Sequence, residues 1–187
     1  DREKGQPMVS AARPLEGRRE LEALFTELGR ELSSDGTVAE VVLVGGSWLL
    51  WHEQRAATRD VDSAQRVAPA VTAAVRRVAN RHGLAEDWLN DRAAMFWPAD
   101  ADLADCRVVY EAGGLTVKVP APEVVFVMKL YRASPQDHED MILLWPSCDF
   151  DSPGAAADAF QRAYPHAPED PHLADYVSEI AAAADAG

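Results

Sequence analysis

The chain has 187 residues, and its 48% hydrophobic and 26% charged content is typical of a globular protein, which excludes an intrinsically disordered chain. Its formal net charge of −13 at pH 7 argues against non-specific DNA binding, which depends on Lys and Arg, but leaves room for a nucleotide held by a few local cations. No apolar run approaches the roughly 20 residues that span a bilayer, and the N-terminus has no signal-peptide pattern, so we expect a cytoplasmic protein without membrane contacts.

The first part of the chain predicts helices and strands in alternation. Leucines at spacings near 3.6 predict a helix over residues 14–32, which ends in the turn residues 33–36. The apolar, β-branched segment 37–44 predicts a buried strand. A short helix over 47–55 and a second strand over 59–63 are expected to follow.

The middle of the chain predicts a helix, an irregular segment and a hairpin. Valines and alanines on one face indicate an amphipathic helix over residues 68–82. The aromatic segment 88–98 has no regular period, and we expect a structured loop there. Two β-branched segments, 106–111 and 115–119, are joined by Ala112-Gly113-Gly114 and predict a β-hairpin.

The last third of the chain has a helical pattern. Pro122 suits the first turn of a helix that continues to residue 133. Ser134-Pro135 begins a second helix, which runs to about residue 145. Several prolines interrupt the remainder, and they leave room for two short helices over 155–163 and 173–184.

The order of these elements predicts the fold class. Strands come early and helices late, so we expect an α+β fold with a small mixed sheet flanked by helices. The predicted organisation is an α/β core over residues 8–120 and a helical C-terminal part over residues 121–187 that packs on this core. Cys106 and Cys148 are far apart and follow no metal-ligand spacing, so we expect reduced thiols.

The strongest chemical signal is a glycine turn followed by a pair of acids. Gly45 and Gly46 let the backbone come close to a ligand, and Ser47 is expected to open a helix whose free N–H groups suit a phosphate. Asp60 and Asp62 are two residues apart on a strand and point to the same face. Because adjacent ionised carboxylates repel each other, the pair favours a cation such as Mg²⁺ between them. Each motif alone is a common turn or surface pair, so the prediction depends on their joint order.

A second set of charged residues lies on the helices after the hairpin. Lys129 emerges from a strongly apolar segment, and Arg132 follows one turn later, where these cations could meet a triphosphate. Asp137 and Asp140 are likewise one turn apart. Alternatively, Lys129 or Arg132 simply pairs with one of these acids and locks the two helices together. Both roles can coexist.

Residues 41–62 and 129–140 resemble the nucleotidyltransferase-fold proteins of the AbiEii-like group, which occur as toxins in bacterial toxin–antitoxin and phage-defence operons. The group combines a Gly-Gly pair after a strand, Thr or Arg before Asp-x-Asp, a lysine-bearing helix and an Asp-x-x-Asp helix. The matching positions are Gly45, Gly46, Thr58, Arg59, Asp60, Asp62, Lys129, Arg132, Asp137 and Asp140. The resemblance implies a nucleotidyltransferase-type fold in which Asp60 and Asp62 bind metal and act in catalysis with Lys129, while the other positions and Ser47 surround the nucleotide.

One feature departs from this pattern. Active members of the superfamily usually carry a third carboxylate on a later strand, close to Asp-x-Asp. Here the inward polar residue of that strand is Lys118, and Glu111 and Glu123 are the candidate substitutes. Without a third acid the most natural general base for an acceptor hydroxyl is missing, which bears on catalysis more than on fold or metal binding.

Histidines and aromatic residues supply weaker candidates. His52 follows the glycine turn on the same helix, although an ordinary, partly buried histidine explains it equally well. His138 lies between the two helix aspartates and is expected to point away from them. Trp88, Phe96 and Trp97 could stack on a nucleobase, or they could cover an edge of the core.

These predictions favour a metal-dependent nucleotidyltransferase with Mg²⁺, or Mn²⁺ in its place, as cofactor. An NTP would bind with its phosphates over the glycine turn, and a hydroxyl of a tRNA, a protein or a small molecule would attack the α-phosphate. An antitoxin protein is a candidate partner. A large RNA acceptor would need a local basic patch, for which the candidates are Arg13, Arg18, Arg19 and Arg30.

Two other functions compete with this one. A degenerate transferase fold would bind a nucleotide or a partner protein without turnover, which Lys118 favours and the intact Asp-x-Asp opposes. A small-molecule transferase of the aminoglycoside-modifying kind would use an acidic cleft for a cationic substrate, but no specific motif marks it.

Overall fold

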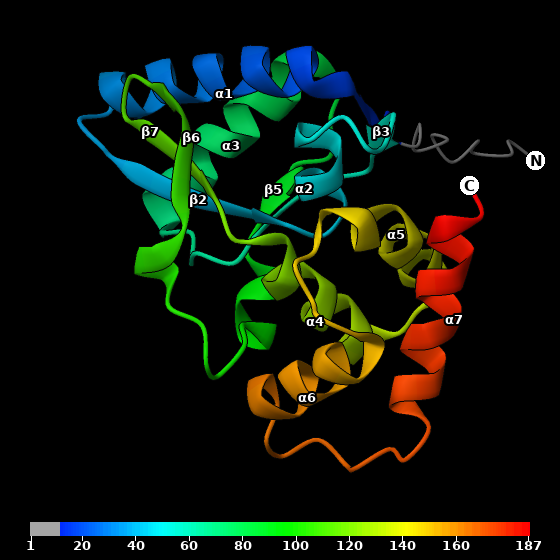
Figure 1. Cartoon of the computed structure of the whole chain (residues 1–187). Coiled ribbons are helices and arrows are strands. Elements are labelled where there is room, and N and C mark those ends of the chain that lie inside the picture. Colours follow the sequence, from blue (N-terminus) through cyan, green and yellow to red (C-terminus); the bar gives the residue numbers. More distant parts are fainter. Residues whose placement is uncertain (1–11) are drawn as a thin grey trace, which may run out of the picture.

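The computed structural model describes residues 12–187 and has a five-stranded mixed sheet at its centre (Figure 1). Its strands are β2 (Ala39–Val44), β4 (Val61–Ser63), β5 (Leu89–Asn90), β6 (Arg107–Ala112) and β7 (Leu115–Val119). They lie in the order β5-β4-β2-β7-β6. β2 pairs in parallel with β7 and antiparallel with β4, so this apolar strand is central and buried on both faces. Two further strands, β1 (Leu15–Glu16) and β3 (Ala57–Thr58), pair with each other.

Helices flank the sheet in two groups. The first comprises α1 (Gly17–Ser34), α2 (Gly45–Trp51) and α3 (Pro69–His82). The second comprises α4 (Pro122–Arg132), α5 (Pro135–Leu144), α6 (Pro153–Ala163) and α7 (Leu173–Asp185), and the 3₁₀ turns are η1 (Arg92–Phe96), η2 (Leu103–Asp105) and η3 (Trp145–Ser147). Figure 1 shows α1 and α3 along one side of the sheet and α4 to α7 gathered together beyond it. The α+β class predicted from the sequence is confirmed.

Three local predictions need correction. The helix expected over 47–55 begins at Gly45 and ends at Trp51, and Glu53 follows with a positive φ of 58° that is incompatible with a continued helix. The strand expected over 59–63 is shorter and comprises only β4 (Val61–Ser63), so Asp60 directly precedes it, while β3 (Ala57–Thr58) lies outside the predicted range. Residues 88–98 are not an irregular loop but contain β5 and η1, because backbone pairing with β4 extends this segment.

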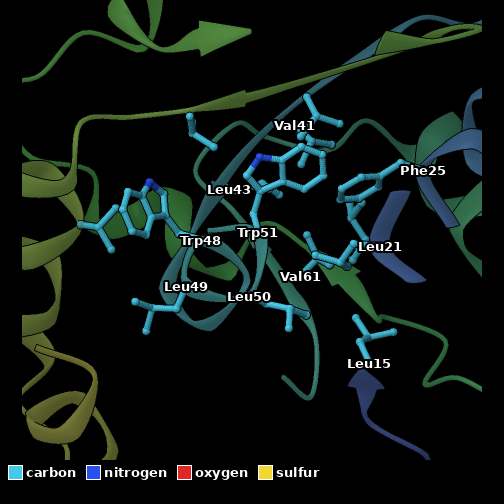
Figure 2. Packing of buried hydrophobic residues seen from close by; sticks show 14 of the residues in the cluster. Leu15, Leu21, Phe25, Val41, Leu43, Trp48, Leu49, Leu50, Trp51 and Val61 are labelled. Atoms are coloured by element: carbon cyan, nitrogen blue, oxygen red, sulfur yellow. The ribbon is translucent and has the colours of Figure 1, made fainter. Parts of the chain in front are cut away.

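The main core lies between α1 and one face of the sheet. Leu21 and Phe25 of α1 pack with Val41 and Leu43 of β2 and with Trp51 of α2 (Figure 2). The ring centroids of Phe25 and Trp51 are 6.1 Å apart. The predicted helical period of α1 therefore identifies the face that the sheet buries.

The opposite face of the sheet carries fewer apolar side chains. Because side chains alternate along a strand, Val42 and Val44 point to this face, where they form a small second cluster. Met128 of α4 packs against that cluster. Asp62 pairs with Val44 in the register of β4 and β2, so its side chain lies on the same, less covered face.

The C-terminal helices share the core of the N-terminal part. Phe126 of α4, Met141 of α5 and Ile180 of α7 belong to the same continuous cluster as Leu21. The two parts predicted over 8–120 and 121–187 thus bury apolar side chains together, while residues 8–11 lie outside the described part. Cys106 and Cys148 are free thiols. Among residues 12–187, no helix has the length and apolar character needed to cross a bilayer.

Candidate functional site

A cleft of about 800 Å³ opens on the less covered face of the sheet. Its walls come from the beginning of α2, the segment around β3 and β4, the turn η1, and the helices α4 and α5. The predicted site residues that line it are Gly45, Gly46, Thr58, Arg59, Asp60, Asp62, Lys129, Arg132, Asp137 and Asp140. The sequence blocks 41–62 and 129–140 therefore meet at one cleft.

Asp62 lies directly against the glycine turn. Gly45 has a positive φ of 60°, and a Cβ atom there would lie 2.9 Å from Oδ2 of Asp62. A side chain at this position would therefore need both a strained backbone and a displaced carboxylate. Gly46 is similarly constrained, since its Cβ would lie 2.8 Å from Oγ1 of Thr58. The glycine pair thus allows a close approach between the backbone and the side chains of Asp62 and Thr58, whereas the sequence predicted a close approach to a ligand.

The carboxylate of Asp62 is poorly neutralised. Burial, and second the charge of Asp60, raise the pKa of Asp62 to about 6, although Arg132, Arg92 and Lys129 act in the opposite direction. Within residues 12–187 no side chain or backbone group forms a hydrogen bond to this carboxylate. A partly buried acid without a hydrogen-bond partner favours a bound proton or cation, and the charge of the neighbouring Asp60 strengthens that preference.

Asp60 is held by two residues that the sequence analysis did not identify. Nη2 of Arg92 lies 2.9 Å from Oδ2 of Asp60, and Nδ2 of Asn90 donates to the same oxygen at 3.3 Å. Arg92 also contacts Asp87, with Nη1 2.6 Å from Oδ2. In the sequence, the only sign of these residues is that polar residues follow the apolar Trp88-Leu89. Asn90 reaches the site because the pairing of β5 with β4 places it opposite Asp62.

Lys129 lies at the centre of a buried ionic cluster. Its Nζ is 3.2 Å from Oδ1 of Asp137 and 2.8 Å from Oδ2 of Asp140. Arg132 approaches Asp137 at 3.3 Å, and Arg55, also missed by the sequence analysis, approaches Asp140 at 3.3 Å. The predicted alternative, in which Lys129 locks the two helices through these acids, is therefore present, and the cluster also forms one wall of the cleft.

Asp137 has a second, local function. Burial opposes its ionisation, but hydrogen bonds from Ser134 and the charge of Lys129 outweigh this effect and hold the pKa of Asp137 below its ordinary value. The backbone N–H and hydroxyl of Ser134 contact the Asp137 carboxylate, while the Ser134 hydroxyl accepts from the Asp137 N–H. This capping box begins α5 and fixes the position of Asp137 in the cluster.

Ser47 and its neighbours differ from expectation in detail. The Ser47 side chain is fully buried, and its hydroxyl donates to the Val44 carbonyl at 2.7 Å, so it does not face the cleft. Thr58 is also buried, and its hydroxyl donates to the Asp60 carbonyl at 3.2 Å. Arg59 is exposed on the cleft wall. The hydroxyls thus support the backbone around the acids.

The candidates for a third carboxylate lie away from the cleft. Lys118 shares the face of Asp62 but pairs with Glu40 at 2.9 Å. Glu111 is exposed on β6, and Glu123 accepts a hydrogen bond from the backbone of Asp149. No group of three or more His, Cys, Asp or Glu side chains in the described part of the chain is arranged to hold a metal ion. Two carboxylates beside an open cleft still fit Mg²⁺ bound together with substrate phosphates, which often supply its remaining ligands.

The aromatic candidates differ in whether they line the cleft. Trp88 is fully buried and donates its indole N–H to the Val75 carbonyl at 3.0 Å, so the prediction that it could stack on a ligand is wrong. Phe96 lines the cleft and Trp97 does not.

The two histidine candidates contact aromatic side chains. His52 stacks on Trp48 at a centroid distance of 3.7 Å, and burial lowers its pKa. His138 contacts the hydroxyl of Tyr176 at 2.9 Å, away from the cleft as predicted.

The mixed sheet with its flanking helices, and the paired aspartates at the glycine turn, define an α+β protein of the nucleotidyltransferase type. A family model described as "Nucleotidyltransferase of unknown function (DUF6036)" matches residues 19–164, and the chain belongs to this family. This range includes all the predicted site residues. No curated protein and no solved structure gave a match.

Proposed function

We propose that this protein is a metal-dependent nucleotidyltransferase that moves a nucleotidyl group from an NTP to a hydroxyl acceptor. The observation that carries the proposal is the unpartnered carboxylate of Asp62, beside Asp60 and the glycine turn, in a cleft rich in cations. An anionic ligand together with a divalent cation would satisfy all of these groups at once.

The charge of the cleft supports an anionic ligand. Five cationic side chains line it, Arg55, Arg59, Arg92, Lys129 and Arg132, against four carboxylates. The whole chain carries a net charge of −13, so this cleft departs from the rest of the molecule. Arg59 is exposed and forms no ion pair among the described residues, so it is available to phosphate oxygens, while Arg92 and Arg132 are exposed arginines that would have to exchange a carboxylate partner for a phosphate.

Each residue has a defined part in the proposed reaction. Asp60 and Asp62 would hold the metal, Mg²⁺ or Mn²⁺, which when bound would neutralise phosphate oxygens and polarise the attacking hydroxyl. The backbone of Gly45-Gly46 lets the phosphates approach. The acceptor oxygen would attack the α-phosphorus and lose its proton to solvent, while the bond from the α-phosphorus to the oxygen that bridges to the β-phosphate breaks and pyrophosphate leaves with that electron pair. Lys129 acts as a positioning residue, because it fixes the cluster from which Arg132 faces the phosphates.

A second function has a specific observation in its favour. Apart from Asp60 and Asp62, the only carboxylates in the described part of the cleft are Asp137 and Asp140, and both are already paired. Lys118, which stands where the usual third acid is expected, pairs with Glu40. A protein with this cleft could bind nucleotide and metal without transferring a nucleotidyl group, or present the bound state to a partner protein. Nucleotide binding without transfer is the result that distinguishes this function.

The proposed membership of the AbiEii-like group and a toxin role rest on the sequence resemblance. We expect that expression of the wild type slows bacterial growth, and that an antitoxin protein relieves this effect. The variant Asp60→Asn/Asp62→Asn should be tolerated. Equal growth with both proteins would contradict the toxin role but would not contradict the proposed transferase activity.

The central experiment is calorimetry with Mg²⁺ and each of the four NTPs. We expect the wild type to bind NTP in a metal-dependent way, and Asp60→Asn/Asp62→Asn to lose that dependence. The matched control is Asp149→Asn/Asp151→Asn, an exposed pair with the same spacing outside the cleft. Transfer of α-labelled nucleotide into tRNA, protein or small acceptors then separates enzyme from binder. Equal NTP binding by the wild type and by Asp60→Asn/Asp62→Asn would contradict the proposal.

A further inference from the structure

Two large aromatic side chains remain exposed on the wall of the cleft. Phe96 at the end of η1 is 40% exposed, and Tyr131 of α4 is 45% exposed. Both line the cleft that contains Asp60 and Asp62. Their ring centroids are 5.8 Å apart and the ring planes are tilted by 43°. Two segments far apart in the chain thus present an aromatic pair, Phe96–Tyr131, at one place.

A buried tyrosine holds this pair in position. Tyr164 is only 9% exposed, and its ring stacks on Tyr131 at a centroid distance of 4.4 Å. Its hydroxyl donates to the backbone carbonyl of Phe96 at 2.7 Å. The same residue therefore supports both members of the pair. Aromatic rings that are fixed but remain partly exposed are ready to bind a flat ligand with little loss of side-chain entropy.

The aromatic pair is continuous with the cations of the cleft. Arg132 directly follows Tyr131, and Arg92 lies at the other end of η1 from Phe96. At a 3₁₀ rise of about 2 Å per residue, the Cα atoms of Arg92 and Phe96 are about 8 Å apart. A ligand that spans both regions has an anionic end and a flat aromatic end, as a nucleotide has.

We propose that the pair Phe96–Tyr131 is the binding platform for the base of the nucleotide. This inference rests on the proposed function, in which the phosphates lie at the glycine turn. Ala93 and Met128, which also line the cleft, are apolar. Stacking is tolerant of base identity because every base has a π face. The platform therefore accepts all four bases and prefers purines over pyrimidines by less than about tenfold, through their larger stacking area.

The test compares NTPs with inorganic tripolyphosphate, which has the phosphate chain but neither ribose nor base, so the aromatic variants identify the part of the difference that comes from the base. Calorimetry in Mg²⁺ is expected to give tighter binding of ATP than of tripolyphosphate by about 5- to 150-fold, the range for one stacked base. Phe96→Ala and Tyr131→Ala should lose most of this difference and leave tripolyphosphate binding unchanged. Phe96→Trp should restore it. The matched control is Met95→Ala, because Met95 is 70% exposed on the same turn but does not line the cleft.

Each unfavourable outcome has a distinct meaning. If ATP and tripolyphosphate bind equally to the wild type, or if Phe96→Ala weakens both alike, the platform is excluded while the phosphate site stands. If neither ligand binds, the proposed function fails and the platform with it. Thermal unfolding of each variant identifies loss of folding, and Phe96→Leu, which keeps an apolar side chain without a π face, then replaces Phe96→Ala.

Discussion

In the folded protein the carboxyl group of Asp62 is still partly protonated near pH 6. Burial, followed by the charge of Asp60, raises its pKa from 3.8 to about 6. Between these two values the folded state retains a proton that the unfolded chain has released. The contribution of Asp62 to the free energy of unfolding therefore falls as pH rises from about 4 to 6, and it stays low above that range.

This behaviour predicts that Asp62→Asn stabilises the protein without metal. The variant removes the charge that burial disfavours, so its free energy of unfolding should exceed that of the wild type near pH 7.5. The upper limit is about 3 kcal/mol, since one pKa unit corresponds to about 1.4 kcal/mol. Near pH 4 the two proteins should be equally stable. Urea unfolding at both pH values provides the measurement, with the exposed Asp151→Asn as control, and a difference that does not change with pH would contradict the expectation.

Arg92 forms an ion pair with Asp60, one of the two carboxylates that would bind the proposed metal. In the absence of nucleotide its guanidinium pairs with Asp60, and in the presence of nucleotide we expect it to turn to a phosphate. Arg92→Ala should therefore bind Mn²⁺ alone about two- to fivefold more tightly, in line with the energy of a partly exposed ion pair, yet bind Mn²⁺–NTP more weakly. Calorimetry measures both affinities, and Arg76→Ala, an exposed arginine paired with Glu86, is the control. A parallel fall in both affinities would argue against this exchange.

The residues of the site differ in how visible they are in the sequence. Asp60 and Asp62 could be predicted as neighbours because they are two residues apart, although only Asp62 lies in β4 and Asp60 directly precedes it. Asn90 and Arg92 could not, since they reach Asp60 only through the pairing of β5 with β4, and a sequence does not reveal that register. Ser47 was assigned to the ligand because it was expected to open a helix whose free N–H groups suit a phosphate, but α2 begins at Gly45 and the Ser47 hydroxyl donates to the Val44 carbonyl.

At the scale of elements, the helices α4 and α5 are joined by charges rather than by apolar packing alone. Lys129, Asp137 and Asp140 are nearly inaccessible to solvent. Removing one partner leaves buried charges without compensation, so Lys129→Ala should lower the free energy of unfolding by about 3–5 kcal/mol. Lys129→Met combined with Asp140→Leu should recover most of this loss, because apolar side chains of similar size can replace a buried ion pair.

Urea unfolding of the wild type, the single variant and the double variant tests this prediction. Full recovery in the double variant together with unchanged NTP affinity would mean that the cluster contributes only to stability. Recovered stability with weakened NTP affinity is the result expected for a positioning role of Lys129. A loss below about 1 kcal/mol for Lys129→Ala would show that water reaches the cluster.

Long elements were predictable and short ones were not. α1 and α3 have an apolar period that identifies both the helix and its buried face, and β2 has a continuous apolar run typical of a strand buried on both faces. β1, β3 and β5 have two residues each, too few for any alternation, and form because neighbouring strands supply hydrogen-bond partners. The predicted loop over residues 88–98 failed for this reason.

The whole molecule combines a strongly acidic surface with one cation-lined cleft. The composition predicted the first property, and only the assembled fold reveals the second, because the five cations come from three separate segments of the chain. The same assembly brings the N-terminal acids against the C-terminal helices. The cleft is therefore a product of both parts of the chain and depends on their common core.

This shared core predicts a single cooperative unfolding transition. Trp51 and Trp88 report on the N-terminal part and Trp145 on the C-terminal part, so tryptophan fluorescence and far-UV circular dichroism should give coincident urea curves. The variant Ile180→Ala, at a fully buried position of α7, should lower the midpoint seen by both probes, with a cost of about 2–5 kcal/mol. If the dichroism signal shifts while the fluorescence of the four tryptophans that remain in a Trp145→Phe background, all of them N-terminal to residue 121, does not, the C-terminal helices unfold separately. The cleft would then lose its α4 wall before the sheet melts, and nucleotide binding would be lost in that first transition.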